Sequence, residues 1–213
     1  MRDIKNIIFD LGGVIIDLNQ TNTVYEFNRL SKVPFEIVYT QGLHDELFQR
    51  LDKGTISEKH FFAELTQQLR YNGPEENLHN AWNAMLLDVP QSRLDLLVRM
   101  KQNYNTFLLS NTCEPHIRAF EHDLYIKHGV RNFNDYFDAV YYSCRVGMRK
   151  PDTEIFELLI KENKLLPHET VFIDDSEQHV RGAGACGIKS YLLPNGVELA
   201  DLLKELDLLD ESF

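Results

Sequence analysis

The chain has 213 residues, 43% of them hydrophobic and 26% charged, a balance typical of a globular protein with a buried core. Its formal net charge of −11 argues against nucleic acid or an anionic membrane surface as a partner, because both attract a basic face. The three cysteines, Cys113, Cys144 and Cys186, form no CxxC pair and are odd in number, which favours reduced thiols in a cytoplasmic protein.

The first element expected is a short buried strand over residues 6–9, an apolar and β-branched run that stops at Asp10. Gly12 and Gly13 follow it and indicate a tight turn. Asp10 and Asp17 interrupt the apolar stretch, so it is too short and too charged for a signal peptide or a membrane-spanning helix, and we do not expect export. Asp10 is therefore expected at the carboxyl end of a strand.

Residues 20–87 show a different pattern, in which apolar residues recur three or four positions apart and no strand is evident. This spacing predicts a series of helices. Phe48, Phe61 and Trp82 fall on it, so we expect them in the core of the segment rather than in a binding site. The predicted helices span residues 23–30, 35–43, 45–54, 57–70 and 75–86.

After Pro90, strands and helices alternate, which predicts right-handed crossovers and a parallel sheet covered by helices on both faces. The expected fold class is α/β, a Rossmann-like doubly wound parallel sheet. We assign residues 1–19 and 88–213 to this core domain and residues 20–87 to an inserted all-α cap domain. The predicted strands span residues 106–110, 139–143, 170–174 and 189–193, and the predicted helices span 93–103, a segment from about 114, 152–163, 177–186 and 198–206.

Polar side chains are expected to gather at one edge of this sheet, because open parallel sheets bind ligands at the carboxyl ends of their strands. Three carboxylates brought together there would resist joint ionisation, and a divalent cation would resolve the conflict. Oxygen ligands without cysteine or histidine favour a hard ion such as Mg²⁺. The side chains expected at this edge are those of Asp10, Ser110, Asn111, Arg149, Lys150, Asp174 and Asp175.

A magnesium site of this kind commonly takes a phosphate oxygen as a further ligand, so the expected substrate is a small phosphorylated metabolite. We expect Asp10 to attack phosphorus and form an aspartyl-phosphate that water then cleaves, without an organic cofactor. The expected catalytic residues are Asp10, Ser110 and Lys150. The expected substrate contacts are Gly12, Gly13, Ser110, Asn111, Arg149 and Lys150, although Asn111 also suits a structural cap and Arg149 a surface pair.

Four motifs occur in an order that resembles the haloacid dehalogenase (HAD) superfamily: FDLGGV, LLSN, GMRKPD and FIDDS. The resemblance implies Asp10 as nucleophile, Mg²⁺ held by Asp10, the Gly12 carbonyl, Asp174 and Asp175, and a small four-helix cap. The stretches LDKGTISEKHFF and FIDDSEQHVRGA are similar to the branch that includes bacterial α-D-glucose-1-phosphate phosphatases and the phosphatase domain of soluble epoxide hydrolase. It implies a phosphatase that hydrolyses a sugar phosphate such as glucose 1-phosphate, as a monomer or weak homodimer.

The sequence departs from the typical phosphatases of this superfamily at Gly12, where they carry the aspartate that acts as general acid. That proton donor is usually worth about 10²–10⁴-fold in rate. One interpretation is a substrate whose leaving group needs little protonation, such as an anomeric hydroxyl, with His116 as a candidate substitute acid. The alternative is a catalytically weak or inactive protein that binds a phosphorylated ligand, although the intact Asp10, Lys150 and Asp175 favour an enzyme.

Overall fold

The predicted α/β fold is confirmed in a computed structural model, which describes residues 3–44 and 47–210, and side chains for all of these except 40–44. A five-stranded, wholly parallel sheet has the order β3-β2-β1-β4-β5. The first two positions of the predicted helix 45–54 lie outside the described residues. The strands are β1 (Asn6–Phe9), β2 (Asn105–Ser110), β3 (Ala139–Tyr142), β4 (Thr170–Asp174) and β5 (Lys189–Leu192).

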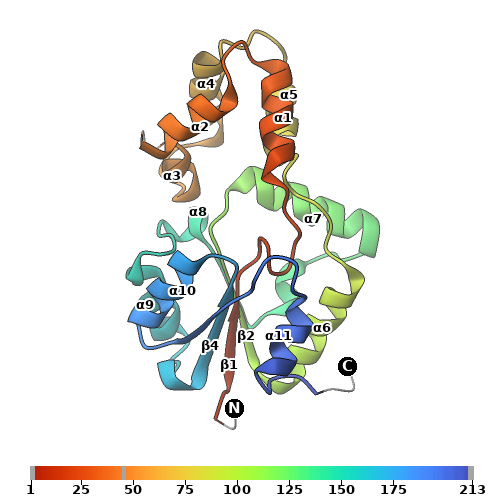
Figure 1. Cartoon of the computed structure of the whole chain (residues 1–213), viewed down its shortest axis with the longest axis vertical. Helices are drawn as coiled ribbons and strands as arrows, with labels where there is room; N and C mark the ends of the chain where they lie inside the picture. The colour runs from red at the N-terminus through yellow and green to blue at the C-terminus, as the bar shows by residue number, and fades with distance from the viewer. Residues whose placement is uncertain (1–2, 45–46, 211–213) are drawn as a thin grey trace.

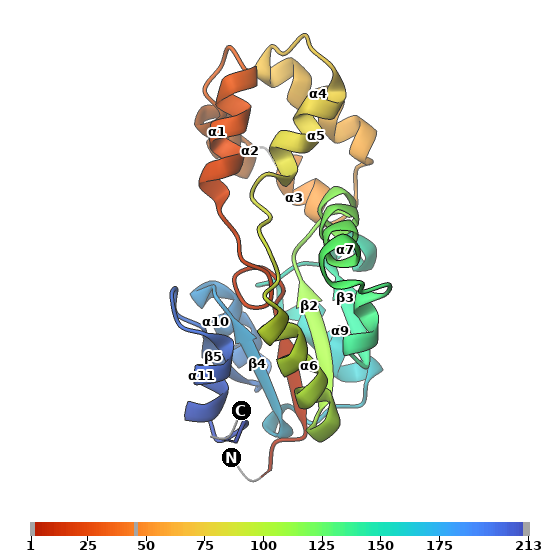
Figure 2. The ribbon, with the colours of Figure 1, turned by 90° about the vertical axis from the view of Figure 1, so that its right-hand side faces the viewer.

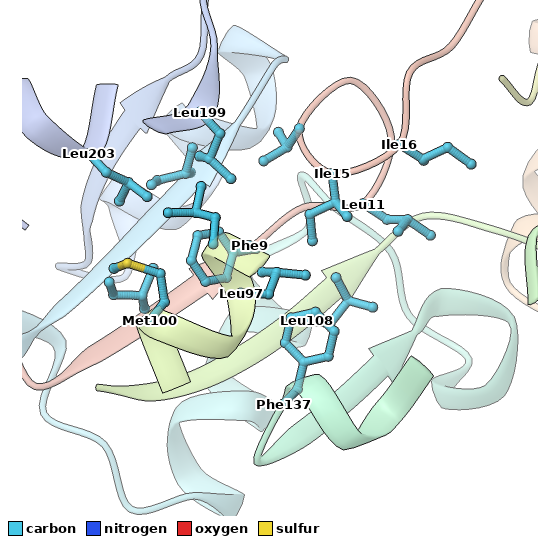
Figure 3. Packing of buried hydrophobic residues seen from close by; sticks show 14 of the residues in the cluster. Phe9, Leu11, Ile15, Ile16, Leu97, Met100, Leu108, Phe137, Leu199 and Leu203 are labelled. Atoms are coloured by element: carbon cyan, nitrogen blue, oxygen red, sulfur yellow. The ribbon is translucent and has the colours of Figure 1, made fainter. Parts of the chain in front are cut away.

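Helices cover both faces of the sheet, and successive residues of its central strand point to opposite faces. Ile7 and Phe9 pack with helices α6, α7 and α11, and Figure 3 shows Phe9 and Leu97 in this cluster. Ile8 packs with α9 and α10 on the other face. The helices, which Figure 2 shows on both sides of the sheet, are α6 (Gln91–Asn103), α7 (Glu114–His128), α9 (Thr153–Glu162), α10 (Glu177–Ala185) and α11 (Leu199–Glu205).

The inserted helices lie beyond the carboxyl edge of the sheet, whereas the described chain ends lie at the opposite edge (Figure 1). Within the described residues this segment forms five helices, one more than the four-helix cap that the resemblance implied. Its side chains build a separate apolar cluster, in which the rings of Phe27 and Phe35 stack at 4.3 Å. This cluster supports the proposed division into core and cap. The cap helices are α1 (Gln20–Leu30), α2 (Phe35–His44), α3 (Leu47–Asp52), α4 (Glu58–Leu69) and α5 (Glu75–Asn83).

The two passages of the chain between sheet and cap run side by side. Leu18 and Leu86 form an antiparallel bridge, and the Leu87 N–H donates to the Asp17 carbonyl at 2.9 Å. The buried Arg93 adds an ion pair to Asp17 at 2.7 Å. Figure 2 shows these two passages of the chain above the sheet. The chain therefore enters and leaves the cap helices at one place.

The helices of the described chain are short, and none of them is long and apolar enough to span a bilayer. One short helix, α8 (Ser143–Val146), was not predicted, and it begins at Ser143, which the sequence placed at the end of the third strand. It ends at Gly147, whose φ of 79° lies in the left-handed region that glycine adopts readily. This helix contacts α3 and so forms part of the junction between the core and the cap.

Candidate active site

A cavity of about 640 Å³ lies between the carboxyl edge of the sheet and the cap helices. Phe48, Phe61 and Trp82 are buried in the cap cluster, as predicted, and Phe48 and Trp82 also line the cavity. From the core, the lining includes Asp10, Leu11, Gly12, Ser110, Asn111, His116, Lys150, Asp175 and His179; from the cap, it includes Val24, Phe35, Tyr39, Phe48, Asp52, Trp82 and Met85.

Lys150 is the centre of the charged cluster on the core side of this cavity. Its side chain is fully buried, and its Nζ lies 2.6 Å from Asp10 Oδ1, 2.6 Å from Asp174 Oδ2 and 2.8 Å from the Leu109 carbonyl. These three hydrogen bonds use all three protons of the ammonium group. Lys150 thus holds two acids and the end of β2 together. Its predicted contact with phosphate remains a prediction.

Asn111 fixes the backbone that carries Lys150. Its Nδ2 donates to the Lys150 carbonyl at 2.8 Å, and its Oδ1 accepts from the Lys150 N–H at 2.9 Å. The amide therefore ties the end of β2 to the loop after α8, which is the structural use that the sequence left open. A substrate contact of Asn111 remains a prediction.

Asp174 is fully buried, and protein donors occupy both of its carboxylate oxygens. Oδ2 binds Lys150, while Oδ1 accepts from the Ser176 N–H at 2.8 Å and lies 2.9 Å from Nδ1 of His179. Although burial opposes ionisation, Lys150 and His179 hold the pKa of Asp174 below its usual value. The sequence analysis missed His179; its position five residues after Asp174, in the first turn of a helix, was the signal that could have found it.

The carboxylates of Asp10, Asp174 and Asp175 form a group that suits a divalent cation. Each offers one oxygen, and these oxygens lie within 4.8 Å of one another. Burial raises the pKa of Asp10 to about 7, Lys150 lowers it and the two neighbouring acids raise it; burial and Asp174 also raise the pKa of Asp175. Three acids beside one buried ammonium group leave an excess of negative charge, which Mg²⁺ offsets with the oxygen donors that it prefers.

The turn after Asp10 uses its two glycines differently. Gly13 has a φ of 74°, and a Cβ there would lie 2.2 Å from Asp175 Oδ2, so a side chain would displace an acid of the cluster. A Cβ on Gly12 would meet only the tip of the Leu18 side chain, at 2.6 Å. Gly12 lines the cavity, whereas Gly13 is not among the lining residues. Position 12 could therefore accept a side chain, but the chain places no acid there.

The other predicted residues have different surroundings. Ser110 is buried at the end of β2 and lines the cavity. Arg149 is not a lining residue; its Nη2 lies 3.7 Å from Asp52 Oδ2 on the cap. His116 lines the cavity, but its Nε2 donates to the Trp82 carbonyl at 3.2 Å, and burial lowers its pKa to about 4. A ring that is neutral at pH 7 does not support the predicted role of His116 as a substitute acid.

The chain is similar to known hydrolases. A family model described as haloacid dehalogenase-like hydrolase matches residues 4–187. The chain is 30% identical over 206 residues to a D-ribitol-5-phosphate phosphatase of Bacteroides thetaiotaomicron, covering 97% of this chain and 98% of that protein. It is 28% identical to a glyceraldehyde 3-phosphate phosphatase of Pyrococcus furiosus, covering 89% and 80%.

Solved structures give the same answer. A HAD family enzyme of Bacteroides thetaiotaomicron, determined in complex with magnesium and inorganic phosphate, matches with a TM-score of 0.82 at 31% identity and covers 93% of this chain and 98% of its own. The carboxylate cluster of this chain suits a hard cation of the same kind. The chain belongs to the haloacid dehalogenase-like hydrolases, as a phosphoric monoester hydrolase that uses Mg²⁺.

Proposed function

We propose that this chain hydrolyses phosphate esters of small sugars or polyols, with Asp10 as the nucleophile. The observation that carries the proposal is the hydrogen bond of 2.6 Å by which the buried Lys150 fixes Asp10 Oδ1 at the edge of a cavity of about 640 Å³. Because Lys150 binds one oxygen of the carboxylate, Asp10 keeps a second for attack. Lys150 also lowers the pKa of Asp10 against the raising effects of burial and the neighbouring acids.

The reaction proceeds in two steps. In the first, the Asp10 carboxylate attacks phosphorus, the P–O bond to the alcohol breaks, and an aspartyl-phosphate forms. In the second, water attacks phosphorus, inorganic phosphate leaves and Asp10 is regenerated. Ser110 and the backbone N–H groups of residues 11–13 donate hydrogen bonds to phosphate oxygens. When bound, Mg²⁺ would stabilise the negative charge of the phosphate. Asp10, Asp175 and the Gly12 carbonyl would hold the ion, with Asp174 behind them.

The proposed substrate class follows from the shape and lining of the cavity. Its core wall is polar, its cap wall is largely aromatic and aliphatic, and its volume leaves room for a phosphorylated small molecule. The similarity to phosphatases named for ribitol 5-phosphate and glyceraldehyde 3-phosphate supports a short hydroxylated substrate. Gly12, without a proton donor, favours an ester at the anomeric position, because an anomeric hydroxyl leaves with less help.

The test of the reaction is Mg²⁺-dependent phosphate release from phenyl phosphate by the wild-type chain and by Asp10→Asn. The wild type should release phosphate, and the variant should lose at least about 10³-fold in rate while keeping its fold by circular dichroism. Equal rates for the two proteins would refute Asp10 as the nucleophile. No release by the wild type from any ester would instead favour a phosphate-binding protein without catalysis.

The test of the substrate compares glucose 1-phosphate, glucose 6-phosphate and D-ribitol 5-phosphate. A preference for glucose 1-phosphate is the outcome expected from Gly12. If D-ribitol 5-phosphate or glucose 6-phosphate is hydrolysed much faster, the anomeric preference is rejected while the sugar and polyol class stands.

A further inference from the structure

The cap wall of the cavity holds a carboxylate, Asp52, among mainly apolar side chains. Val24, Phe35, Trp82 and Met85 line the same wall, and they match the carbon atoms of a substrate rather than its hydroxyl groups. Asp52 comes from the cap helix α3 and is not one of the three acids that group around a common point on the core side. A carboxylate in this wall can accept hydrogen bonds from a bound ligand.

The position of Asp52 is unfavourable for an ionised group. It is the last residue of α3, where the partial negative charge of the helix end repels a carboxylate. Its ion pair with Arg149 Nη2 measures 3.7 Å, which is longer than a hydrogen bond. Burial raises the pKa of Asp52 to about 6, although Arg149 opposes the shift. The carboxylate is thus partly buried and weakly paired, and it has acceptor capacity to spare.

Attachment of the cap does not explain Asp52, since neighbouring residues already provide it. Lys53 pairs with Asp152 of the core at 3.2 Å, and Arg118 donates to Glu58 of the cap at 2.7 Å. Both pairs are closer than the one that Asp52 makes. A residue needed only to join the two parts would gain little from facing the cavity.

We propose that Asp52 determines specificity by accepting hydrogen bonds from hydroxyl groups of the alcohol part of the substrate. The inference rests on the proposed phosphatase function and deepens it, because it names the residue that recognises the hydroxyl groups of such substrates. An O–H bond to a carboxylate is among the stronger hydrogen bonds in proteins. An ester without hydroxyls would leave Asp52 with only its long ion pair to Arg149, and should react roughly 10- to 100-fold less well.

The experiment compares two esters of primary alcohols with the same chain length, D-ribitol 5-phosphate and n-pentyl phosphate. Their leaving groups are of one kind, so they differ mainly in hydroxyl groups. The wild type should prefer the ribitol ester in kcat/KM. In Asp52→Ala, kcat/KM for that ester should fall roughly 10- to 100-fold, mostly through KM, with pentyl phosphate nearly unchanged. Asp52→Asn should recover part of the loss, because its amide oxygen still accepts.

The matched control is Lys53→Ala, which removes an adjacent ion pair between cap and core but is not among the lining residues. It should leave the ratio of the two esters unchanged. If Asp52→Ala slows both esters equally, or if the wild type shows no preference for the ribitol ester, the inference is overturned. Mg²⁺-dependent hydrolysis of phenyl phosphate, measured in parallel, tells this failure apart from failure of the proposed function.

Discussion

The two walls of the cavity are built in opposite ways. On the core wall, Lys150 Nζ lies 2.6 Å from both Asp10 and Asp174, two acids at the carboxyl ends of β1 and β4. On the cap wall, Asp52 lies 3.7 Å from Arg149, and most of the other lining side chains there are apolar. Hydrogen bonds within the protein fix the reacting groups in place, whereas the group proposed to select the substrate keeps acceptor atoms without a donor.

The largest effect is expected when the lysine at the centre of the core wall is replaced. Lys150→Met should lower the rate with phenyl phosphate by at least about 10³-fold and the free energy of unfolding by about 3–5 kcal/mol, because it leaves two buried acids without their cation. Phosphate release and urea denaturation measure the two effects. Lys53→Ala, at a largely exposed pair, should cost at most about 1 kcal/mol. Similar stability of the two variants would contradict the assigned role of Lys150.

The next largest effect is expected from the turn that carries the core wall. Gly13→Ala should weaken Mg²⁺ binding by roughly 10- to 100-fold, since its Cβ would lie 2.2 Å from Asp175 Oδ2 and its φ of 74° strains an L residue. Gly12→Ala is the matched control and should change the affinity only a few-fold, because the tip of Leu18 can move. Calorimetric titration measures both. Equal losses would show that Asp175 is not the reason for glycine at position 13.

The cap wall should respond to substitution in the opposite sense. Asp52→Asn should stabilise the fold by about 2 kcal/mol at pH 8, because a carboxyl whose pKa rises from 3.8 to about 6 on folding disfavours the folded state above pH 6. Since the folded protein holds this proton more tightly, the gain should shrink as the pH falls from 6 toward 4. Thermal melts at pH 8 and pH 4 test this. An unchanged gain at both values would rule out the charge as its cause.

The smallest effect concerns pH and metal affinity. Mg²⁺ binds the ionised carboxylates, and burial raises the pKa of Asp10 to about 7. The apparent Kd for Mg²⁺ should therefore rise as the pH falls below about 7, by at most tenfold per unit, and level off above it. Titrations at pH 5.5, 6.5 and 8 measure the slope. Asp52→Asn should keep it and Asp10→Asn should lose most of it; a Kd independent of pH in the wild type would refute proton competition at Asp10.

The core could be predicted from the sequence because its signals are local. The run of residues 6–9 is apolar and ends in Asp10, and the parallel arrangement of strands then brings Ser110 and Asp174 to the same edge. Lys150 lies in no strand, and only its motif indicated it. The tie between Asn111 and the Lys150 backbone was not predictable, since it joins residues 39 apart through a loop.

The cap was predicted only as a set of helices. Helical spacing shows that Phe48 and Trp82 are buried, but not whether they face the cap interior or the cavity, because this depends on how the cap docks on the core. The same docking brings Asp52 toward Arg149, across 97 positions of sequence in which no periodicity links them. His179 was not predicted because it lies only five residues after Asp174, across the junction of β4 and α10, where a polar contact resembles ordinary helix capping.

The bridge between Leu18 and Leu86 makes the inserted helices a removable module. Because the chain leaves the sheet and returns at neighbouring, hydrogen-bonded positions, a short turn could join the two passages without changing the order or register of any strand. Evolution could therefore replace the cap helices with another insertion and give the same phosphoryl-transfer chemistry a new substrate.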